Sequence, residues 1–150
     1  MKKYILFIIV ITLLSCQDKS IYKDFRNIRN EEWCINDTLS FEVHVSESRE
    51  YNMNLYVRHT TDYEMANLWC FIQVSDSSGT VLKDTVNMKL AEADGRWMGD
   101  GNSIKTVKQA INSPHIELNE GLYTIKIEQG MRVKCLKGIK DVGISIETIK

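Results

Sequence analysis

Cys16 is the residue whose surroundings most directly specify a chemistry. Lys2 and Lys3 precede a nearly unbroken apolar stretch that runs from Tyr4 to Leu14. The stretch is about a dozen residues long, whereas a stable membrane span needs roughly 20, so the pattern is typical of a secretory signal peptide. Residues 13–16, Leu-Leu-Ser-Cys, resemble a bacterial lipobox. We therefore expect a diacylglycerol on the Cys16 sulfur, cleavage before Cys16, and an acyl chain such as palmitate on the new amine.

Several acyl chains on one residue meet the requirement for stable anchoring, because a single chain gives only marginal membrane binding. Two other interpretations stay open, an ordinary secretory signal with a coincidental cysteine and an uncleaved membrane anchor. The expected organisation is a signal peptide over residues 1–15, a lipidated N-terminus and polar tether over residues 16–30, and one domain over residues 31–150. No cofactor is expected beyond the covalent lipid.

The composition limits the classes of protein to consider. Removal of residues 1–15 would leave residues 16–150, which are enough for one domain with a real core and too few for two. Once Lys2 and Lys3 leave with the signal, the 20 Asp and Glu residues outnumber the remaining Lys and Arg, and no basic stripe is present. Nucleic-acid binding is therefore not expected.

The cysteines other than Cys16 leave their redox state open. Cys34, Cys70 and Cys135 each sit among apolar residues, and a compartment outside the cytoplasm permits disulfides. One bridge with one free thiol is an alternative to three buried thiols. We favour three buried thiols, because cysteine in such surroundings commonly behaves as a small hydrophobe. The spacing does not match a zinc site, and no metal site is expected.

Period-two alternation of apolar and polar residues runs through most of the chain and predicts half-buried strands. Residues 68–74 are apolar nearly throughout, which is typical of a strand buried on both faces or central to a sheet. Residues 103–111 are ambiguous between a strand and an amphipathic helical turn. The other expected strands cover residues 39–45, 51–58, 80–88, 115–118, 122–129 and 142–149.

About eight short antiparallel strands without a confident long helix predict an all-β fold, an antiparallel β-sandwich of the immunoglobulin-like or jelly-roll kind. A closed barrel is the main alternative. Asn119, Gly121 and Tyr123 have the spacing of a tyrosine corner at the start of a strand. In such a corner the hydroxyl binds an upstream backbone group.

The three histidines, His44, His59 and His115, are the first candidates for catalytic residues. The G-x-S-x-G motif of serine hydrolases is missing from the sequence. His59 lies near Asp62 and Glu64, which could orient it as a general base in a small hydrolase. We favour the simpler interpretation that His59 lies at a solvated strand end. His44 and His115 are expected at the surface.

A glycine-rich loop over residues 92–102 gathers Glu92, Asp94 and Asp100. Carboxylate oxygens suit Ca²⁺, but the loop does not have the residue order of an EF-hand. A glycosidase would need two carboxylates held at a fixed separation in a cleft, and nothing in the sequence indicates such a pair. We expect a structural loop in which glycines supply positive φ and Trp97 folds over an open edge of the sandwich.

Aromatic residues offer a separate binding hypothesis, an exposed platform for glycans or protein partners. The simpler alternative is that Trp69 is in the core and the others are half-buried. The residues concerned are Trp33, Trp69, Trp97, Tyr51, Tyr56 and Tyr63.

Four segments in order resemble the gliding-motility lipoproteins of type H (GldH) of the Bacteroidetes, besides the lipobox and its short tether. The resemblance covers nearly the whole chain. The segments are Asn54-Leu55-x-Val57-Arg58 with Asp62-Tyr63 and Asn67-Leu68; Asp94-Gly95-Arg96-Trp97-Met98-Gly99-x-Gly101; Gly121-x-Tyr123 with Glu128-Gln129-x-Met131-Arg132; and Gly138-Ile139-x-Asp141-Val142-Gly143.

The resemblance implies a role in the cell envelope and no reaction or cofactor. Family members serve gliding over surfaces, which is tied in that phylum to the type IX secretion machinery, so the expected partners are other envelope proteins. A surface glycan-binding module is the alternative. The resemblance offers Arg58, Asp94, Trp97, Arg132 and Asp141 as fold or partner-contact residues, with Arg132 and Asp141 as one conceivable pair between strands.

The resemblance also bears on location and on the cysteines. Residues 17–20 lack the acidic run that marks surface export in some of these bacteria. We therefore expect a protein anchored in the envelope at the periplasmic face of the outer membrane. Cys34, Cys70 and Cys135 are not part of the family pattern, so a disulfide would be particular to this protein.

Overall fold

The computed structural model describes residues 19–111 and 115–149. The predicted signal peptide and the expected lipidation of Cys16 lie outside the described residues. Within the described ranges no helix is long and apolar enough to cross a membrane. The elements are β1 (Ser20–Asn27), η2 (Arg29–Glu31), β2 (Glu32–Cys34), β3 (Leu39–Val45), β4 (Arg49–Thr60), β5 (Asn67–Asp76), β6 (Gly79–Lys89), β7 (Ile104–Ala110), β8 (Ile116–Leu118), β9 (Gly121–Gln129), β10 (Cys135–Lys137) and β11 (Ile139–Thr148).

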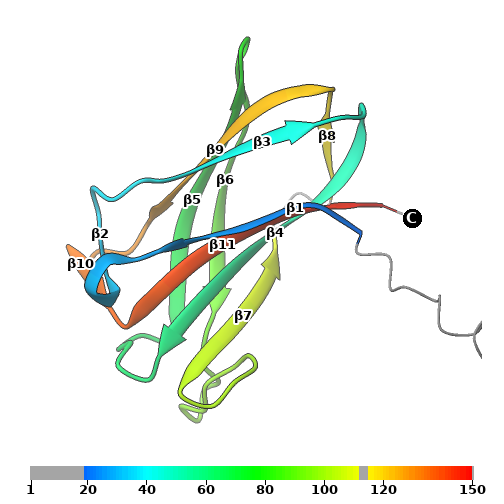
Figure 1. Cartoon of the computed structure of the whole chain (residues 1–150). Helices are drawn as coiled ribbons and strands as arrows, with labels where there is room; N and C mark the ends of the chain where they lie inside the picture. Colours follow the sequence, from blue (N-terminus) through cyan, green and yellow to red (C-terminus); the bar gives the residue numbers. More distant parts are fainter. Residues whose placement is uncertain (1–18, 112–114, 150) are drawn as a thin grey trace, which may run out of the picture.

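Two antiparallel sheets pack face to face (Figure 1), which confirms the predicted all-β sandwich. The five-stranded sheet has the order β1-β11-β4-β7, and β8 pairs with the start of β4. The four-stranded sheet has the order β3-β9-β5-β6, and a short ribbon pairs β10 with β2. Because every pairing is antiparallel, strand ends gather at two opposite ends of the sandwich.

The two ends of the sandwich differ in what they carry. At the N-terminal end, the start of β1 meets the end of β11, where the Thr148 N–H donates to the Lys19 carbonyl at 2.9 Å. The opposite end, here called the disulfide end, holds the β2–β10 ribbon and the loops over residues 61–66, 90–103 and 130–134. The start of β1 and the β2–β10 ribbon lie on opposite sides in Figure 1.

The core lies between the sheets and is built from the inward positions that the alternation predicts. Phe41, Val43 and Val45 of β3 face it, and so do Ile125 and Ile127 of β9. Removing such side chains from water is the main force that closes the sandwich.

The tyrosine corner is present at the start of β9. The Tyr123 hydroxyl donates to the Asn119 carbonyl at 3.1 Å and accepts from the Asn119 N–H at 2.9 Å.

The predicted tether is wrong for residues 20–27, because this segment is β1, an edge strand paired with β11 over most of its length. Phe25 of β1 lies across from Gly143, and a Cβ on Gly143 would come within 2.4 Å of the Phe25 ring. An aromatic ring packed over a sheet glycine anchors β1 through a contact that only glycine allows.

Two strand predictions are settled by the pairing. Residues 104–110 form a strand, β7, so the helical alternative is wrong. β5 is central to its sheet, between β9 and β6, as one of the two interpretations required. It is not buried on both faces, because Trp69 and Phe71 point outward and are exposed.

The favoured interpretation of three buried thiols is wrong, because Cys34 and Cys135 form a disulfide across the β2–β10 ribbon. The two residues are direct partners in the register, and the adjacent Ile35 N–H donates to the Lys134 carbonyl at 2.9 Å. This spacing makes Cys34 and Cys135 a non-hydrogen-bonded pair, in which side chains approach most closely. Cys70 remains a free, buried thiol, and burial raises its pKa.

Candidate functional site

Arg58 and Asp141 form an ion pair on the outer face of the five-stranded sheet. They are register partners on β4 and β11, and Arg58 Nε donates to Asp141 Oδ1 at 2.6 Å. The Asp141 side chain is fully buried, and its Oδ2 has no hydrogen-bond partner among the described residues. The Arg58 guanidinium also lies 4.9 Å from the centre of the Phe25 ring, and the hydrogen bond to Asp141 raises the pKa of Arg58. The conceivable pairing of Arg132 with Asp141 is therefore wrong, because Asp141 pairs with Arg58.

A network of side chains extends this outer face toward the N-terminal end. The Asn54 side-chain amide donates to Ser145 Oγ at 3.3 Å, and Ser145 Oγ donates to a Glu147 carboxylate oxygen at 3.0 Å. The same Glu147 oxygen pairs with Lys108 at 2.9 Å, which lowers the pKa of Glu147 against the opposing effect of burial. The Asn54 and Ser145 side chains are buried and paired, so this surface is fixed in shape.

The loop at residues 90–103 holds Asp94 and Trp97 at the disulfide end. Asp94 accepts from the Arg96 N–H at 3.1 Å, and the two side chains form an exposed pair at 3.9 Å. Glu92 pairs with Lys89 at 2.5 Å. Among the described residues, no three His, Cys, Asp or Glu side chains lie close enough together to hold a metal ion.

The glycines of this loop have the positive φ that the sequence indicates. Gly99 has φ +81°, and a Cβ there would lie 2.3 Å from the Thr106 carbonyl oxygen. The loop therefore folds back against the start of β7, which brings Trp97 to the end of the core.

His59 is not the solvated residue that the sequence suggested. It is fully buried at the end of β4, with its ring 4.8 Å from the ring of Trp97 and 5.9 Å from that of Tyr63. Its Nδ1 is 2.9 Å from the Thr60 carbonyl, which places the proton on Nδ1. Burial lowers the pKa of His59, with a further lowering from Lys105.

The expected orienting carboxylates do not reach His59. Asp62 and Glu64 line an open hollow with Lys137 and Gly138, and His59 is not part of its lining. The Nε2 atom of His59 has no hydrogen-bond partner in the described part of the chain. A buried imidazole without a carboxylate partner or solvent access is poorly placed to act as a general base. His44 and His115 are exposed, as predicted.

The six aromatic residues proposed as a platform do not form one. Trp33 is fully buried and its Nε1 donates to the Asp37 carbonyl at 2.8 Å. Trp97 is half-buried against His59, and only Trp69 is clearly exposed among the three tryptophans. The remaining members, Tyr51, Tyr56 and Tyr63, are all buried.

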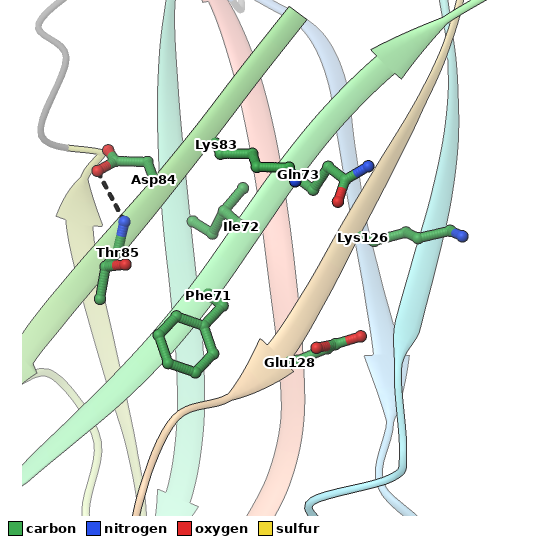
Figure 2. A pocket seen from close by; sticks show the side chains of 8 residues that line it. All are labelled: Phe71, Ile72, Gln73, Lys83, Asp84, Thr85, Lys126 and Glu128. Atoms are coloured by element: carbon green, nitrogen blue, oxygen red, sulfur yellow. Dashed lines mark hydrogen bonds between the residues drawn. The ribbon is translucent and has the colours of Figure 1, made fainter. Parts of the chain in front are cut away.

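Trp69 instead belongs to a surface that the sequence analysis missed. Trp69 and Phe71 alternate along β5 on the outer face of the four-stranded sheet, with 40% and 49% of their surface exposed. Beside Phe71 is a hollow of about 520 Å³ (Figure 2), lined by Phe71, Ile72, Gln73, Lys83, Asp84, Thr85, Lys126 and Glu128.

A second hollow, of about 590 Å³, lies on the other side of Trp69, where the loop between β9 and β10 meets the start of β5. It contains Arg132, the remaining residue that the resemblance offered. Its lining consists of Met65, Asn67, Trp69, Gly130, Met131, Arg132 and Val133. We call Trp69, Phe71, Met131, Val133 and the cations Lys83, Lys126 and Arg132 the aromatic face.

The signal for this surface was present in the sequence. Residues 68–74 are apolar on the inward positions, so Trp69, Phe71 and Gln73 had to point outward once the segment was a strand with one buried face. The five residues that the resemblance offered do not form one site. They lie toward the disulfide end on three surfaces, namely the Arg58–Asp141 pair, the loop with Asp94 and Trp97, and the loop with Arg132.

Comparison with known proteins identifies the family. The family model described as GldH lipoprotein matches residues 20–146, which is nearly all of the sandwich.

This chain belongs to the GldH lipoprotein family.

Two relatives agree with this assignment. The gliding motility lipoprotein GldH homolog of Christiangramia forsetii is 27% identical over 153 residues, with 94% of this chain and 93% of the relative covered. The gliding motility lipoprotein GldH of Flavobacterium johnsoniae is 27% identical over 151 residues, with 95% and 94% covered. As a GldH family member, the chain is a membrane-anchored lipoprotein.

Solved structures are similar only at a lower level. A family 35 carbohydrate binding module from Clostridium thermocellum matches with a TM-score of 0.44 and 16% identity, over 86% of this chain and 90% of its own. A likeness of this degree carries no argument about function.

Proposed function

We propose that this GldH family protein is a non-catalytic component or accessory of the gliding and type IX secretion machinery. It acts by docking on other envelope proteins, and Cys16 anchors it at the periplasmic face of the outer membrane. The observation that carries the proposal is the family match over residues 20–146, together with relatives named for gliding motility.

A non-catalytic role is supported by the surroundings of the titratable side chains. His59 is enclosed by Trp97 and Tyr63, and its Nδ1 is engaged by a backbone carbonyl. Cys70 is fully buried with a raised pKa, so its reactive thiolate form is suppressed. Burial shifts the pKa of both His59 and Cys70, but it also shields them from substrate. Among the described residues, neither is placed beside a side chain that could activate it for catalysis.

The short segment between Cys16 and β1 supports anchoring close to the membrane. Ser20 starts β1, so only residues 17–19 separate the lipidated residue from the sheet. Fully extended, this segment spans at most ~14 Å. The N-terminal end of the sandwich is then the end nearest the lipid, and the disulfide end extends away from it.

The test uses the native bacterium, in which the gene for this protein is deleted and then reintroduced as a single copy, either wild-type or mutated. We expect the wild-type protein to restore gliding, and Cys16→Ala to fail although it folds and accumulates. Tagged wild-type protein should recover gliding or secretion components from crosslinked envelopes, and Cys16→Ala should not. Normal gliding without the gene, or full function of Cys16→Ala, would contradict the proposal.

Glycan binding is a second candidate, favoured by the exposure of Trp69 and Phe71 beside the polar groups of Gln73, Lys126 and Glu128. Sugar rings stack on exposed aromatic side chains while polar groups bind their hydroxyls. Native gel electrophoresis in gels containing cell-surface polysaccharide separates the candidates. Retardation that Trp69→Ser abolishes supports glycan binding, and unchanged mobility supports protein docking.

A further inference from the structure

The aromatic face exposes large apolar side chains on a rigid strand at the centre of a sheet. β5 is hydrogen-bonded on both sides, to β9 and to β6, so the backbone beneath Trp69 and Phe71 is fixed. Gly130 packs against the Phe71 ring and the base of the Trp69 side chain, since a Cβ there would lie 3.0 Å from the Phe71 ring and 3.3 Å from Trp69 Cβ. Rigid side chains lose little entropy on binding, which favours them as anchors of an interface.

The second hollow is held in shape in the same way. The Gly130 N–H donates to the Trp69 carbonyl at 2.7 Å, and the Trp69 N–H donates to Met131 Sδ at 3.2 Å. The Gln129 side chain accepts from the Met131 N–H at 2.8 Å and donates to the Val133 carbonyl at 2.9 Å. The loop is therefore folded around its own hydrogen bonds, and it presents methionine, valine and arginine beside Trp69.

The charged rim of the aromatic face is net positive, with Lys83, Lys126 and Arg132 against the two carboxylates of Asp84 and Glu128. Lys83 and Lys126 lie across from each other on either side of Gln73, and Arg132 stands at the other hollow. None of these three cations forms an ion pair with another residue of the described part. Two carboxylates also line the first hollow. Glu128 accepts a hydrogen bond from the Thr38 hydroxyl at 2.7 Å, and Asp84 accepts one from the Thr85 N–H at 2.7 Å. Aromatic, methionine and arginine side chains are the types enriched in protein interfaces, and cations without partners attract carboxylates.

Two other occupants fit the surface less well. The lipid joins the chain at the N-terminal end through residues 17–19, which span at most ~14 Å, whereas Trp69 and the second hollow lie toward the disulfide end, so the anchor brings a different part of the sandwich to the bilayer. A second copy in a two-fold contact would oppose two patches of the same net positive charge, each with three cations and two carboxylates.

We propose that the aromatic face is a docking site for another envelope protein that presents an apolar side chain flanked by carboxylates. The apolar side chain seats beside Trp69 and Phe71, and the carboxylates face Lys83, Lys126 and Arg132. This inference rests on the proposed docking function and adds the surface and the chemistry of the partner.

The test begins with a photo-crosslinking phenylalanine analogue at position 71 of the full-length lipoprotein in the native bacterium. The matched control carries the analogue at Leu122, which is 70% exposed on the same outer face but at the N-terminal end. We expect a discrete adduct with a protein from position 71 and not from position 122. The partner is then identified by mass spectrometry and purified.

The second step measures the affinity of the purified pair. We expect Trp69→Ser with Phe71→Ser to weaken binding at least about 10-fold, as loss of interface anchors does. Lys83→Glu with Lys126→Glu should weaken it several-fold in low salt and less in high salt, and carboxylate-to-lysine changes in the partner should restore binding to that variant. Leu122→Ser and Arg29→Glu, which alter exposed residues outside the face, should leave it unchanged.

Each contrary result overturns the inference. An adduct with polysaccharide, an adduct with a second copy of this chain, equal crosslinking at both positions, or unchanged affinity in the charge-reversed variant would do so. Failure here is distinguishable from failure of the proposed function. If the face variants bind and glide normally while Cys16→Ala does not, the anchored role stands and the docking site lies elsewhere.

Discussion

Removing the disulfide by replacing Cys34 and Cys135 with alanine should cost this domain a large part of its stability. The two cysteines are 101 residues apart in sequence. Closing a loop of that length in the unfolded chain is worth up to about 4.7 kcal/mol at 25 °C in the chain-entropy account. The residues beside them, Trp33 and Leu136, are buried and are not altered by the substitution, so we expect the folded state to change little. We expect a loss of about 3–5 kcal/mol.

The assay is urea unfolding of the lipid-free domain beginning at Gln17, without reductant. The variant should unfold at lower urea and with a larger m-value, because its unfolded state is no longer held compact by the cross-link. Cys70→Ala is the matched control, since it removes a sulfur without removing a cross-link. It should lower stability by a cavity effect and leave the m-value unchanged.

Thiol titration of the same domain supplies an independent count. Native protein should react slowly, because burial encloses Cys70 and raises its pKa. Unfolding without reductant should expose one thiol for each chain, and prior reduction should expose three. Three reactive thiols in the unreduced protein, or a double variant within about 1 kcal/mol of the parent with the same m-value, would refute the reasoning.

Three further changes test particular contacts. Arg58→Met should destabilise the domain by about 3 kcal/mol in urea unfolding, because it leaves the buried Asp141 carboxylate unpaired; a matching Asp141→Leu change in that variant should recover most of the loss, and a cost below about 1 kcal/mol would contradict the pairing. Because the pKa of His59 is lowered in the folded state, protons bind the unfolded chain first as pH falls below about 6.5. Stability should therefore drop from pH 7.5 to pH 5.5 by urea unfolding, and His59→Asn should show a smaller drop; an equal drop in both would exclude His59 as the cause. Tyr123→Phe should cost about 1 kcal/mol of unfolding free energy, because the Asn119 backbone loses its side-chain partner; no measurable change would show that water replaces the hydroxyl there.

The sandwich could be predicted because its strands carry a local signal. Alternation placed Phe41 and Val43 inward, and the spacing of Asn119 and Tyr123 identified a corner that depends only on neighbours in the chain. The sequence did not predict β1 as a strand, because β1 is an edge strand with polar residues on both faces. Its place in the sheet depends on the contact of Phe25 with Gly143, which is 118 positions away in the printed sequence.

The site predictions failed where the decisive partner was distant in sequence. His59 has polar neighbours along the chain, yet Trp97 from a later loop encloses it. Nothing near Cys34 indicates that Cys135 lies opposite, because the register of a three-residue ribbon decides it. The aromatic face was accessible to prediction in part, since the outward positions of β5 follow from the period. The hollow beside Trp69 was not, because it depends on how the Gly130–Val133 loop folds.

The most direct test of the proposed role is co-purification from crosslinked envelopes of the native bacterium. Tagged wild-type protein is compared with Cys16→Ala at equal abundance, and recovered proteins are identified by mass spectrometry. The docking account predicts reproducible recovery of gliding or type IX secretion components with the wild type and their loss with Cys16→Ala. Recovery of no such component with the wild type, or the same components with both proteins, would contradict it.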